Sequence, residues 1–457
     1  MRNIALTFLG CFTILAACSN SDDAEKPVAP IPTGDVTIYS TTNSLTRDLT
    51  RDAVNFSLKD NLAPTSITLN PTEQYQTMDG FGVAITGATC FNLLQMKPED
   101  RHAFLTETFS DDKGFGFSYI RISIGCSDFS LSEYTCCDKK GIENFALQSE
   151  EKEYILPILK EILDINPSIK IIAAPWTCPT WMKVKSLTDL TPFESWTNGQ
   201  LNPAYYQDYA TYFVKWVQAF NAEGIDIYAV TPQNEPLNRG NSASLYMSWE
   251  EQRDFVKTAL GPKFKTAGLA TKIYAYDHNY DYSDIETEKN YPGKMYEDPA
   301  ASQYLAGAAY HNYGGNREEL LNMHKAYPEK ELLFTETSIG TWNSGRDLSK
   351  RLLEDMKEVA LGTINNWCKG VIVWNLMLDN DRAPNREGGC QTCYGAVDIS
   401  NSDYKTIIRN SHYYIIAHLS SVVKPGALRI GATGYADSNI MYSACLLYTS
   451  PSPRDGL

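Results

Sequence analysis

The segment Ala204–Glu235 reads AYYQDYATYFVKWVQAFNAEGIDIYAVTPQNE. Apolar residues recur at helical period over Ala204–Ala222. A short run rich in Ile, Val, Tyr and Ala follows over Asp226–Glu235, and it is too short for a helix. The segment therefore predicts a helix and then a buried strand whose last residues are Asn234 and Glu235.

The same alternation extends over most of the chain. Further short apolar runs are Met78–Thr86, Phe117–Gly125, Ile169–Trp176, Lys272–Asn279, Ala306–Tyr313, Leu332–Thr337 and Gly370–Leu376. Stretches of helical period lie between them, as in Glu151–Asp164 and Asp347–Asn365. Eight strands alternating with helices over roughly 300 residues are typical of a (β/α)8 TIM barrel, in the α/β class. A doubly wound open sheet would also alternate, but no GxGxxG follows the first run and a count of eight fits closure better.

Both flanks of the predicted barrel have β-like patterns. Val36–Tyr75 contains several short β-like runs, and Ile415–Ser421 and Ala427–Ile430 begin another pattern of this kind. We expect both ends to join in one β-sandwich attached to the barrel. The predicted boundaries are residues 35–77 for the N-terminal strands, 78–410 for the barrel and 411–444 for the start of the C-terminal sandwich.

The first residues are typical of a bacterial export signal. Residues 1–17 combine a basic start with an apolar stretch too short to span a bilayer as a mature helix, so they predict a signal peptide. Leu15–Cys18 resembles a lipoprotein cleavage box in which Cys18 is lipidated; an ordinary signal peptide is the alternative. Ser19–Asp23 resembles the export signal of surface lipoproteins, and residues 18–34 are interpreted as a disordered tether. We therefore expect an exported outer-membrane lipoprotein that faces the outside of the cell, anchored only by its lipid.

The last residues have an unusual composition. Cys445–Asp455 reads CLLYTSPSPRD, which back-translates to a widely used sequencing adapter. We therefore interpret residues 445–457 as an assembly artefact and expect the C-terminal sandwich to be incomplete. Because Pro451 and Pro453 cannot continue a β pattern, we expect no native contribution from the tail.

Charge and cysteine content exclude several classes of partner. A net charge of −15 argues against binding to nucleic acid or to anionic membrane surfaces. The pairs Cys136–Cys137 and Cys390–Cys393 are typical of loop staples in an exported chain, and we expect Cys390 and Cys393 to lie within disulfide reach. Zinc is the alternative, but the six histidines form no HxH or HxxxH pair. We expect neither a metal nor a cofactor.

The ends of the predicted strands contain the chemically active residues. Function in such barrels lies at the carboxyl ends of the strands. Two isolated carboxylates, Glu235 and Glu336, would meet in one cavity from the fourth and seventh strands. Retaining cleavage of a glycoside needs such a pair about 5–5.5 Å apart, one carboxyl to protonate the leaving oxygen and one carboxylate to attack the anomeric carbon.

Other strand-end residues suit a sugar. Asn234 can contact a sugar 2-hydroxyl, and Trp176 and Trp374 offer flat apolar faces to a sugar ring. A surface lipoprotein that binds glycan without cutting it would need the tryptophans but not two carboxylates. That non-catalytic class is the remote alternative.

The ordered motifs resemble those of glycoside hydrolase family 30. They are Met78-Asp79-Gly80-Phe81-Gly82, Ile120-Arg121-Ile122-Ser123, Ala174-Pro175-Trp176-Thr177-Cys178-Pro179, Thr231-Pro232-Gln233-Asn234-Glu235-Pro236, Tyr276-Asp277-His278-Asn279, His311-Asn312-Tyr313, Phe334-Thr335-Glu336 and Val373-Trp374-Asn375-Leu376. The resemblance implies that Glu235 is the acid/base and Glu336 the nucleophile of a retaining β-glycosidase.

The resemblance also implies roles for the surrounding residues. Asp128, Trp176, Asn234, His311, Tyr313 and Trp374 would bind substrate, with Tyr313 hydrogen-bonded to the nucleophile. Arg121, Asp79, His278 and Asn385 would support the site, with Arg121 helping to keep Glu336 ionised. Three alternatives stay open: Arg121 as a purely structural ion-pair partner, Asp79 as a strand-entry turn residue, and the histidines as residues that only orient their neighbours.

The loop after the last strand departs from the family pattern. Asp381–Asn385 replaces a Gly-Gly-Pro-Asn turn, and the Cys-containing segment Gly388–Gly395 resembles the β-1,6-glucanase branch of the family. The expected substrate is therefore β-1,6-glucan. Glucosylceramidase or exo-β-glucosidase/β-xylosidase activity is the alternative, and the oligomeric state stays open.

Overall fold

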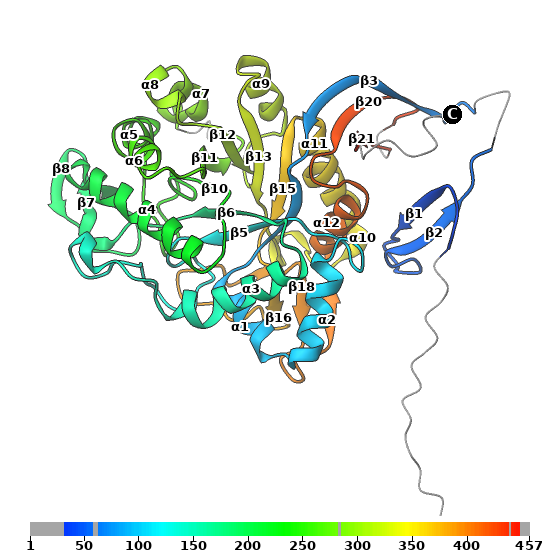
Figure 1. Cartoon of the computed structure of the whole chain (residues 1–457), viewed down its shortest axis with the longest axis horizontal. Helices are drawn as coiled ribbons and strands as arrows, with labels where there is room; N and C mark the ends of the chain where they lie inside the picture. The colour runs from blue at the N-terminus through cyan, green and yellow to red at the C-terminus, as the bar shows by residue number, and fades with distance from the viewer. Residues whose placement is uncertain (1–31, 58–62, 282–284, 438–439, 448–457) are drawn as a thin grey trace, which may run out of the picture. The chain divides into compact units, whose positions relative to one another are not determined.

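The computed structural model describes residues 32–57, 63–281, 285–437 and 440–447 (Figure 1). The predicted signal peptide, the Cys18 lipidation site, most of the tether and residues 448–457 lie outside them. The chain divides into two compact units, Met1–Ile38 with Arg51–Ser57 and Tyr39–Thr50 with Leu58–Leu457. Among the described residues, no helix is long and apolar enough to cross a membrane.

The larger unit contains a closed barrel of parallel strands in sequence order (Figure 1). The barrel strands are β4 (Gly80–Ala84), β5 (Tyr119–Ser123), β6 (Lys170–Ala174), β10 (Ala229–Val230), β11 (Lys272–Asn279), β12 (Gly307–His311), β13 (Glu331–Glu336) and β15 (Cys368–Val373). β15 closes the barrel by pairing with β4, with Gly370 opposite Gly80. Each of the eight strands overlaps its predicted run, so the TIM-barrel prediction is confirmed. The predicted end of the fourth strand is wrong, since β10 ends at Val230 and Asn234 and Glu235 lie beyond it.

A layer of buried side chains from seven of the barrel strands packs as one cluster. Its members are Tyr119, Ile172, Ala229, Tyr274, Ala309, Leu333 and Ile372. Such layers fill the interior of small parallel barrels, and the barrel is therefore a packed core rather than a pore.

Helices follow the strands and lie around the outside of the barrel (Figure 1). They are α1 (Gly87–Gln95), α2 (Pro98–Phe109), α3 (Leu156–Ile165), α4 (Tyr206–Ala222), α5 (Trp249–Phe255), α6 (Gly261–Thr266), α7 (Tyr291–Tyr296), α8 (Pro299–Ser302), α9 (Glu318–Ala326), α10 (Leu348–Asp355), α11 (Gly362–Asn365) and α12 (Ser411–Val422). The predicted helix Glu151–Asp164 is a π-helical turn followed by α3, and α10 and α11 flank a second such turn.

The two flanks of the barrel join, as predicted, but in one sheet. β3 (Ile67–Thr77), β20 (Leu428–Gly434) and β21 (Ala444–Leu446) form an antiparallel sheet in the order β21-β20-β3. β1 (Val36–Ser40) and β2 (Thr50–Val54) pair in a separate two-stranded sheet. Within the described residues the expected sandwich is thus a single three-stranded layer.

Two C-terminal predictions need correction. Ile415–Ser421 lies in helix α12 rather than in a strand, because nearly all of α12 is buried and so shows no one-sided apolar stripe. The tail does take part in the fold at its start, since Arg429 pairs with Cys445 and Leu428 with Leu446. Cys445 and Leu446 are apolar and therefore continue the β pattern up to the point where the Pro-rich part of the tail begins.

Short sheets shape the loops after the barrel strands. They are β7 (Lys183–Ser186) with β8 (Asp189–Pro192) and β9 (Gln200–Leu201), β14 (Ile339–Gly340) with β17 (Cys393–Tyr394), and β16 (Met377–Asp379) with β18 (Val397–Ile399) and β19 (Ile407–Arg409). Several of these strands carry the loops that line the site described below.

One of the two predicted cysteine staples is present. Cys390 and Cys393 form a disulfide with their Cα atoms 5.8 Å apart, which confirms that prediction. Cys136 and Cys137 are free and buried, so the staple predicted there is wrong. Each of these two thiols instead contacts an oxygen nearby, Cys136 at Glu151 and Cys137 at the carbonyl of Gly141.

Candidate active site

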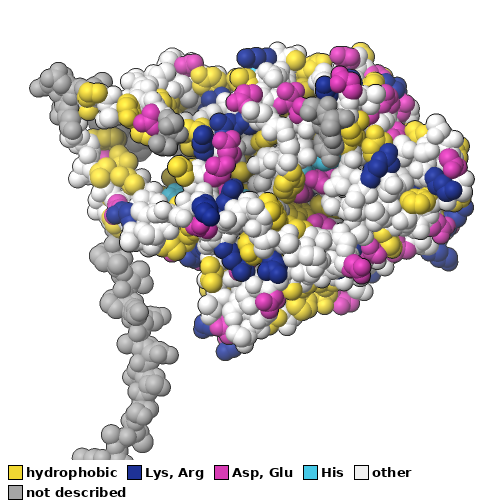
Figure 2. All heavy atoms as spheres, turned by 180° about the vertical axis from the view of Figure 1, so that it is seen from behind, with side chains coloured by type: hydrophobic (Ala, Val, Ile, Leu, Met, Phe, Trp, Pro, Cys, Tyr) yellow, Lys and Arg dark blue, Asp and Glu magenta, His cyan; other side chains and the backbone are white. Residues whose placement is uncertain are grey.

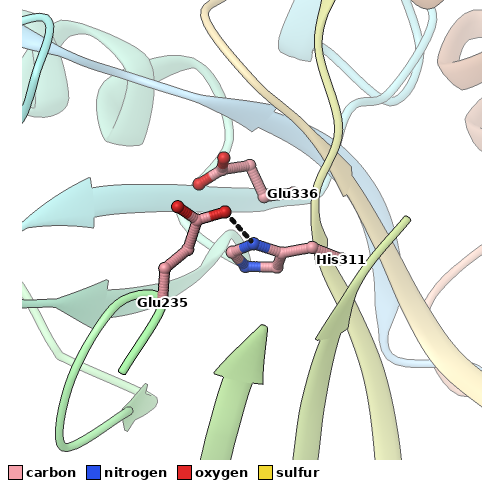
Figure 3. Close-up of side chains that lie close together, drawn as sticks. All are labelled: Glu235, His311 and Glu336. Carbon is pink, nitrogen blue, oxygen red and sulfur yellow. Dashed lines mark hydrogen bonds and ion pairs between the residues drawn. The ribbon is translucent and has the colours of Figure 1, made fainter. Parts of the chain in front are cut away.

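Two glutamates meet at the carboxyl ends of the barrel strands. Glu235 follows β10, Glu336 ends β13, and both side chains are almost fully buried. One oxygen of each carboxyl lies within 4.8 Å of the other and of a ring nitrogen of His311 (Figure 3). This separation suits a nucleophile next to an acid, whereas an inverting pair needs about 6.5–9.5 Å for a water between them.

Direct contacts distinguish the two carboxyls. The Oε2 of Glu336 accepts a 2.6 Å hydrogen bond from the Nη1 of Arg121, and its Oε1 accepts one of 3.0 Å from the hydroxyl of Tyr313. The Oε2 of Glu235 accepts weaker, uncharged hydrogen bonds from Asn238 at 2.7 Å and Asn241 at 3.3 Å. The structure therefore gives Glu336 the stronger charged partner, as predicted for Arg121.

The two carboxyls titrate as a pair. Burial raises the pKa of both, and the negative charge of Glu235 raises the pKa of Glu336 further. The cation of His311, 3.4 Å from Glu235, lowers the pKa of both carboxyls, and at Glu235 the hydrogen bond from His311 together with His278 and Asn238 outweighs burial. Of the two glutamates, Arg121 contacts only Glu336, at a shorter distance than His311 from Glu235 and with a permanent charge, and on this geometry we assign the first ionisation to Glu336 and the remaining proton to Glu235.

Asp277 holds this arrangement from below. Its carboxylate accepts hydrogen bonds from Arg121 at 2.9 Å, Thr231 at 2.7 Å, His311 at 3.0 Å and Thr335 at 2.6 Å. Burial raises the pKa of Asp277, but Arg121 and His311 outweigh it and hold this pKa well below its usual range. Asp277 is therefore a buried anion that fixes the orientation of Arg121 and His311.

The backbone is strained where it aims these side chains. Glu235, Tyr276 and Asp277 have φ angles of 44°, 74° and 68°, in the left-handed region that non-glycine residues rarely adopt. The register between β11 and β12 shifts at this point. The amide of Glu235 donates to the carbonyl of Asp277 at 2.9 Å, which ties the two strained positions together. Such strain costs about 1–3 kcal/mol per residue and is typical of functional sites.

The two histidines of the site have opposite protonation states. Burial lowers the pKa of His311, but the charge of Glu336 and the hydrogen bonds to Asp277 and Glu235 raise it to about 9. His311 is therefore a cation between Asp277 and Glu235. Burial lowers the pKa of His278 to about 4, so this ring is neutral; its Nε2 lies 3.9 Å from the Oε1 of Glu235.

A cavity of about 280 Å³ opens above the glutamates. Its lining residues are Asp128, Glu235, Asn238, Asn241, His278, Asn279, Tyr313, Glu336, Ser338, Trp342, Trp374, Cys390 and Cys393. The molecular face in Figure 2 is hollowed near its centre, with acidic and hydrophobic side chains inside the hollow. The cavity thus combines the two glutamates with aromatic, amide and sulfur groups.

Some predicted substrate-binding residues line the cavity and others lie beneath it. Asp128, Tyr313 and Trp374 line it, whereas Trp176, Asn234 and His311 are buried and not part of its lining. Asn234 accepts a 2.7 Å hydrogen bond from Arg121. His311 lies beside the carboxyl of Glu235 in Figure 3 and is joined to it by a hydrogen bond, a position that suits orienting the carboxyl.

Two tryptophans form a stack at the side of the cavity. The rings of Trp176 and Trp374 lie 5.2 Å apart at 27°, and the guanidinium of Arg121 lies 5.0 Å and 5.4 Å from their centres. Trp176 is only 2% exposed. It therefore supports Trp374, which presents the ring to the cavity.

Asp128 has one oxygen free for a ligand. Its Oδ1 is buried and has no hydrogen-bond partner among the described residues. Burial, and then the charges of Glu336 and Glu235, raise the pKa of Asp128 to about 7. Near neutral pH this carboxyl can therefore donate or accept a hydrogen bond to a substrate hydroxyl.

Two residues predicted to support the site lie away from the cavity. Asp79 precedes β4 at the amino end of the barrel and pairs with Lys170 at 2.7 Å, so the strand-entry alternative holds. Asn385 donates to the carbonyl of Arg382 within its own loop. The prediction that Asp79 supports the site is therefore wrong, because the cavity is at the opposite ends of the strands.

The glutamates and His311 are close enough to hold a metal ion, but their other contacts do not suit one. Glu235, His311 and Glu336 could each offer one ligand atom. However, Arg121 already bonds Glu336, and the cationic ring of His311 bonds Asp277. These fixed positive charges oppose a metal ion, and the same carboxyls suit proton transfer and nucleophilic attack.

The fold and this carboxyl pair define a glycosidase. Residues 78–423 match the model of the glycosyl hydrolase family 30 TIM-barrel domain, and the chain belongs to that family. A solved structure described as the endo-β1,6-glucanase BT3312 shares 87% identity over 90% of each chain, with a TM-score of 0.89.

More distant relatives represent two branches. Endo-1,6-beta-D-glucanase BGN16.3 of Trichoderma harzianum is 32% identical over 79% of this chain and 72% of its own length. Lysosomal acid glucosylceramidase of Mus musculus is 26% identical over 83% of this chain and 74% of its own length.

Proposed function

We propose that this chain is a retaining endo-β-1,6-glucanase with Glu235 as acid/base and Glu336 as nucleophile. The observation that carries the mechanism is the short separation of these carboxyls, with one oxygen of each within 4.8 Å of the other, and the hydrogen bond from Arg121 to Glu336 but not to Glu235. The linkage comes from the 87% identity with BT3312. The much lower identity with glucosylceramidase does not favour that alternative.

The proposed reaction has two steps. The carboxylate of Glu336 attacks the anomeric carbon while Glu235 gives its proton to the departing glycosidic oxygen. A water then attacks the anomeric carbon of the glycosyl ester, Glu235 takes the water's proton, and the bond between the anomeric carbon and Glu336 breaks. The hydrogen bonds from Tyr313 and Arg121 stabilise the negative charge of Glu336. They weaken as Glu336 bonds to the sugar and loses this charge, and they strengthen again when the bond to the sugar breaks.

Three substrates separate the candidate activities. Linear β-1,6-glucan, glucosylceramide and an aryl β-glucoside are incubated with the purified protein, and product lengths are measured over time. The proposal expects early release of mixed β-1,6-linked oligomers from the glucan, with little turnover of glucosylceramide. Release of glucose alone from chain ends would show exo action, and preference for glucosylceramide would overturn the proposed substrate.

We also propose export as a lipoprotein acylated at Cys18, on the sequence of residues 15–23. In a bacterial host, fatty-acid labelling of the wild-type chain and of Cys18→Ala tests this. The proposal expects label in the membrane fraction for the wild type only. Equal labelling, or release of both chains into the medium, would contradict it.

A further inference from the structure

Trp342 differs from the other tryptophan that lines the cavity. Its side chain is 53% exposed, whereas Trp374 and both glutamates are almost fully buried. The difference in exposure indicates that Glu235, Glu336 and Trp374 lie at the floor of the cavity and that Trp342 lies at its mouth. An exposed tryptophan at the mouth of a polar cavity offers an apolar face to a ligand.

The ring of Trp342 is held in place by its own turn. A Cβ on Gly340 would meet the Cζ3 of Trp342 at 1.9 Å, so the ring lies directly on the glycine. The amide of Gly340 donates to Asn343 at 3.0 Å, and Gly345 donates back to Gly340 at 2.9 Å. The face is thus preorganised, which reduces the entropy lost when a ligand binds.

The disulfide connects this turn to the floor of the cavity. β14 pairs with β17, with Gly340 opposite Cys393, and Thr341 donates to the carbonyl of Thr392 at 3.0 Å. Cys393 belongs to the same hydrophobic cluster as Trp374, and Cys390 packs against it. Trp374, the disulfide and Trp342 therefore give the cavity an apolar lining from floor to mouth.

Polar groups suited to hydroxyls line the same cavity. Asn238 and Asn241 present amides beside Glu235. The Oδ1 of Asn279 is buried and has no hydrogen-bond partner among the described residues. Apolar faces combined with amides match a sugar, whose ring has C–H faces and hydroxyl edges.

We propose that Trp342 and the Cys390–Cys393 disulfide form the subsite for the leaving-group sugar, next to the glutamates. The leaving sugar must depart while the rest of the substrate is still bonded to Glu336, so its subsite has to open to solvent. The exposure of Trp342 at the mouth meets that requirement. The inference rests on the proposed retaining mechanism.

The partition of the covalent intermediate tests this subsite. An acceptor sugar in the subsite can replace water: its hydroxyl oxygen bonds to the anomeric carbon, its proton passes to Glu235, and the bond to Glu336 breaks. The ratio of transfer to hydrolysis therefore reports acceptor binding and not the rate of the first step. It is measured with short β-1,6-linked oligomers as donor and acceptor, at one fixed acceptor concentration.

Trp342→Ala is expected to lower the transfer ratio about 3- to 10-fold, the range of one aromatic contact. Trp342→Phe should restore most of it. Gly340→Ala, allowed by its extended backbone, should lower the ratio because the new methyl group displaces the ring. Tyr435→Ala, an exposed aromatic residue beyond β20, is the control and should leave it unchanged.

A lower rate with an unchanged transfer ratio in Trp342→Ala would overturn the subsite. Circular dichroism of each variant confirms that it folds. If the wild-type protein cleaves aryl β-glucosides but no β-1,6-glucan, the proposed substrate fails. The same ratio, measured with the aryl donor, still decides the role of Trp342.

Discussion

Arg121 is the residue that makes two neighbouring glutamates unequal. It is fully buried, reaches Glu336 and Asp277 with its two terminal nitrogens, and stacks over Trp176 and Trp374. A permanent cation in this position stabilises the ionised form of Glu336, but not that of Glu235, without a metal ion. The residue that makes the two glutamates differ in charge, Arg121, therefore lies on β5, two strands away from β10, which Glu235 follows.

Replacing each glutamate by glutamine should separate their roles. Glu336→Gln should lower turnover of every substrate by on the order of 10⁴-fold or more, because no nucleophile remains. Glu235→Gln should slow cleavage of glucan strongly but still react with nitrophenyl glycosides, whose leaving groups need little protonation. Mass spectrometry should then show a covalent glycosyl adduct on Glu235→Gln. Equal losses on both substrates with no adduct would refute the assignment.

His311 should make stability depend on pH. Its pKa is raised to about 9 in the folded protein, above the value of an unfolded histidine. Its contribution to stability is therefore complete below about pH 6.5 and is lost as the pH rises towards 9. The melting temperature of the wild type should exceed that of His311→Gln most clearly at pH 6 and least at pH 9.5. A gap independent of pH would show that His311 is neutral; His102→Gln, on the surface of α2, is the control.

Sequence alone identifies the site residues that lie in strand motifs but only a few of those in loops. Glu235, Glu336, Arg121 and Tyr313 were predictable because they occupy fixed positions in the strand motifs. Asn238, Asn241, Ser338 and Trp342 come from loops, where no periodicity relates sequence position to direction. Asp277 was visible in its motif, but its central role depends on a strained backbone that no pattern reveals.

At the level of elements, Arg386 joins three loops around the cavity. Its guanidinium donates to the carbonyls of Ser127 at 2.7 Å and Ser242 at 2.5 Å and to Glu133 at 3.1 Å. Ser127 precedes Asp128, and the loop of Ser242 also carries the amides that contact Glu235. Arg386 is thus a positioning residue rather than a catalytic one.

Arg386→Ala should misplace these loops and lower kcat/KM roughly 10-fold, because small displacements of reacting groups are costly. Arg386→Lys should recover little, since one ammonium cannot bond both carbonyls at once. The melting temperature should change by only a few degrees. The exposed neighbour Glu387→Ala is the matched control. A fall in stability without a change in kcat/KM would show a purely structural role.

The elements differ in how well the sequence predicts them. The barrel strands were predictable because each is a short apolar run bounded by polar residues. Helix α12 was not, since Tyr413–Ala417 is buried on every side and buried helices and buried strands have the same pattern. The sequence does not predict β21, because the Pro- and Ser-rich residues after it hide the short run Ala444–Leu446 that pairs with β20.

At the scale of the whole molecule, the catalytic residues and a group of stabilising ion pairs lie at opposite ends of the barrel. The glutamates lie at the carboxyl ends of the strands, and ion pairs join the amino ends. Glu331 at the start of β13 contacts Lys272 at 2.8 Å, Lys369 at 2.6 Å and the hydroxyl of Tyr274. It thus joins β11, β13 and β15, and a change there should affect stability without touching the reaction.

Glu331→Gln should therefore lower the melting temperature at pH 7 while leaving kcat/KM unchanged well below that temperature. Burial raises the pKa of Glu331, but the hydrogen bonds from Lys272, Lys369 and Tyr274 lower it to about 2. Its stabilising contribution is then complete above the unfolded value near 4.5 and is lost as the pH falls towards 2. Thermal unfolding followed by circular dichroism should show a gap between wild type and variant that is constant from pH 7 to 5 and closes below. Glu329→Gln, an exposed carboxylate just before β13, should show no such gap. A gap that persists at pH 2, or a matching loss of kcat/KM, would show that the two ends of the barrel are not independent.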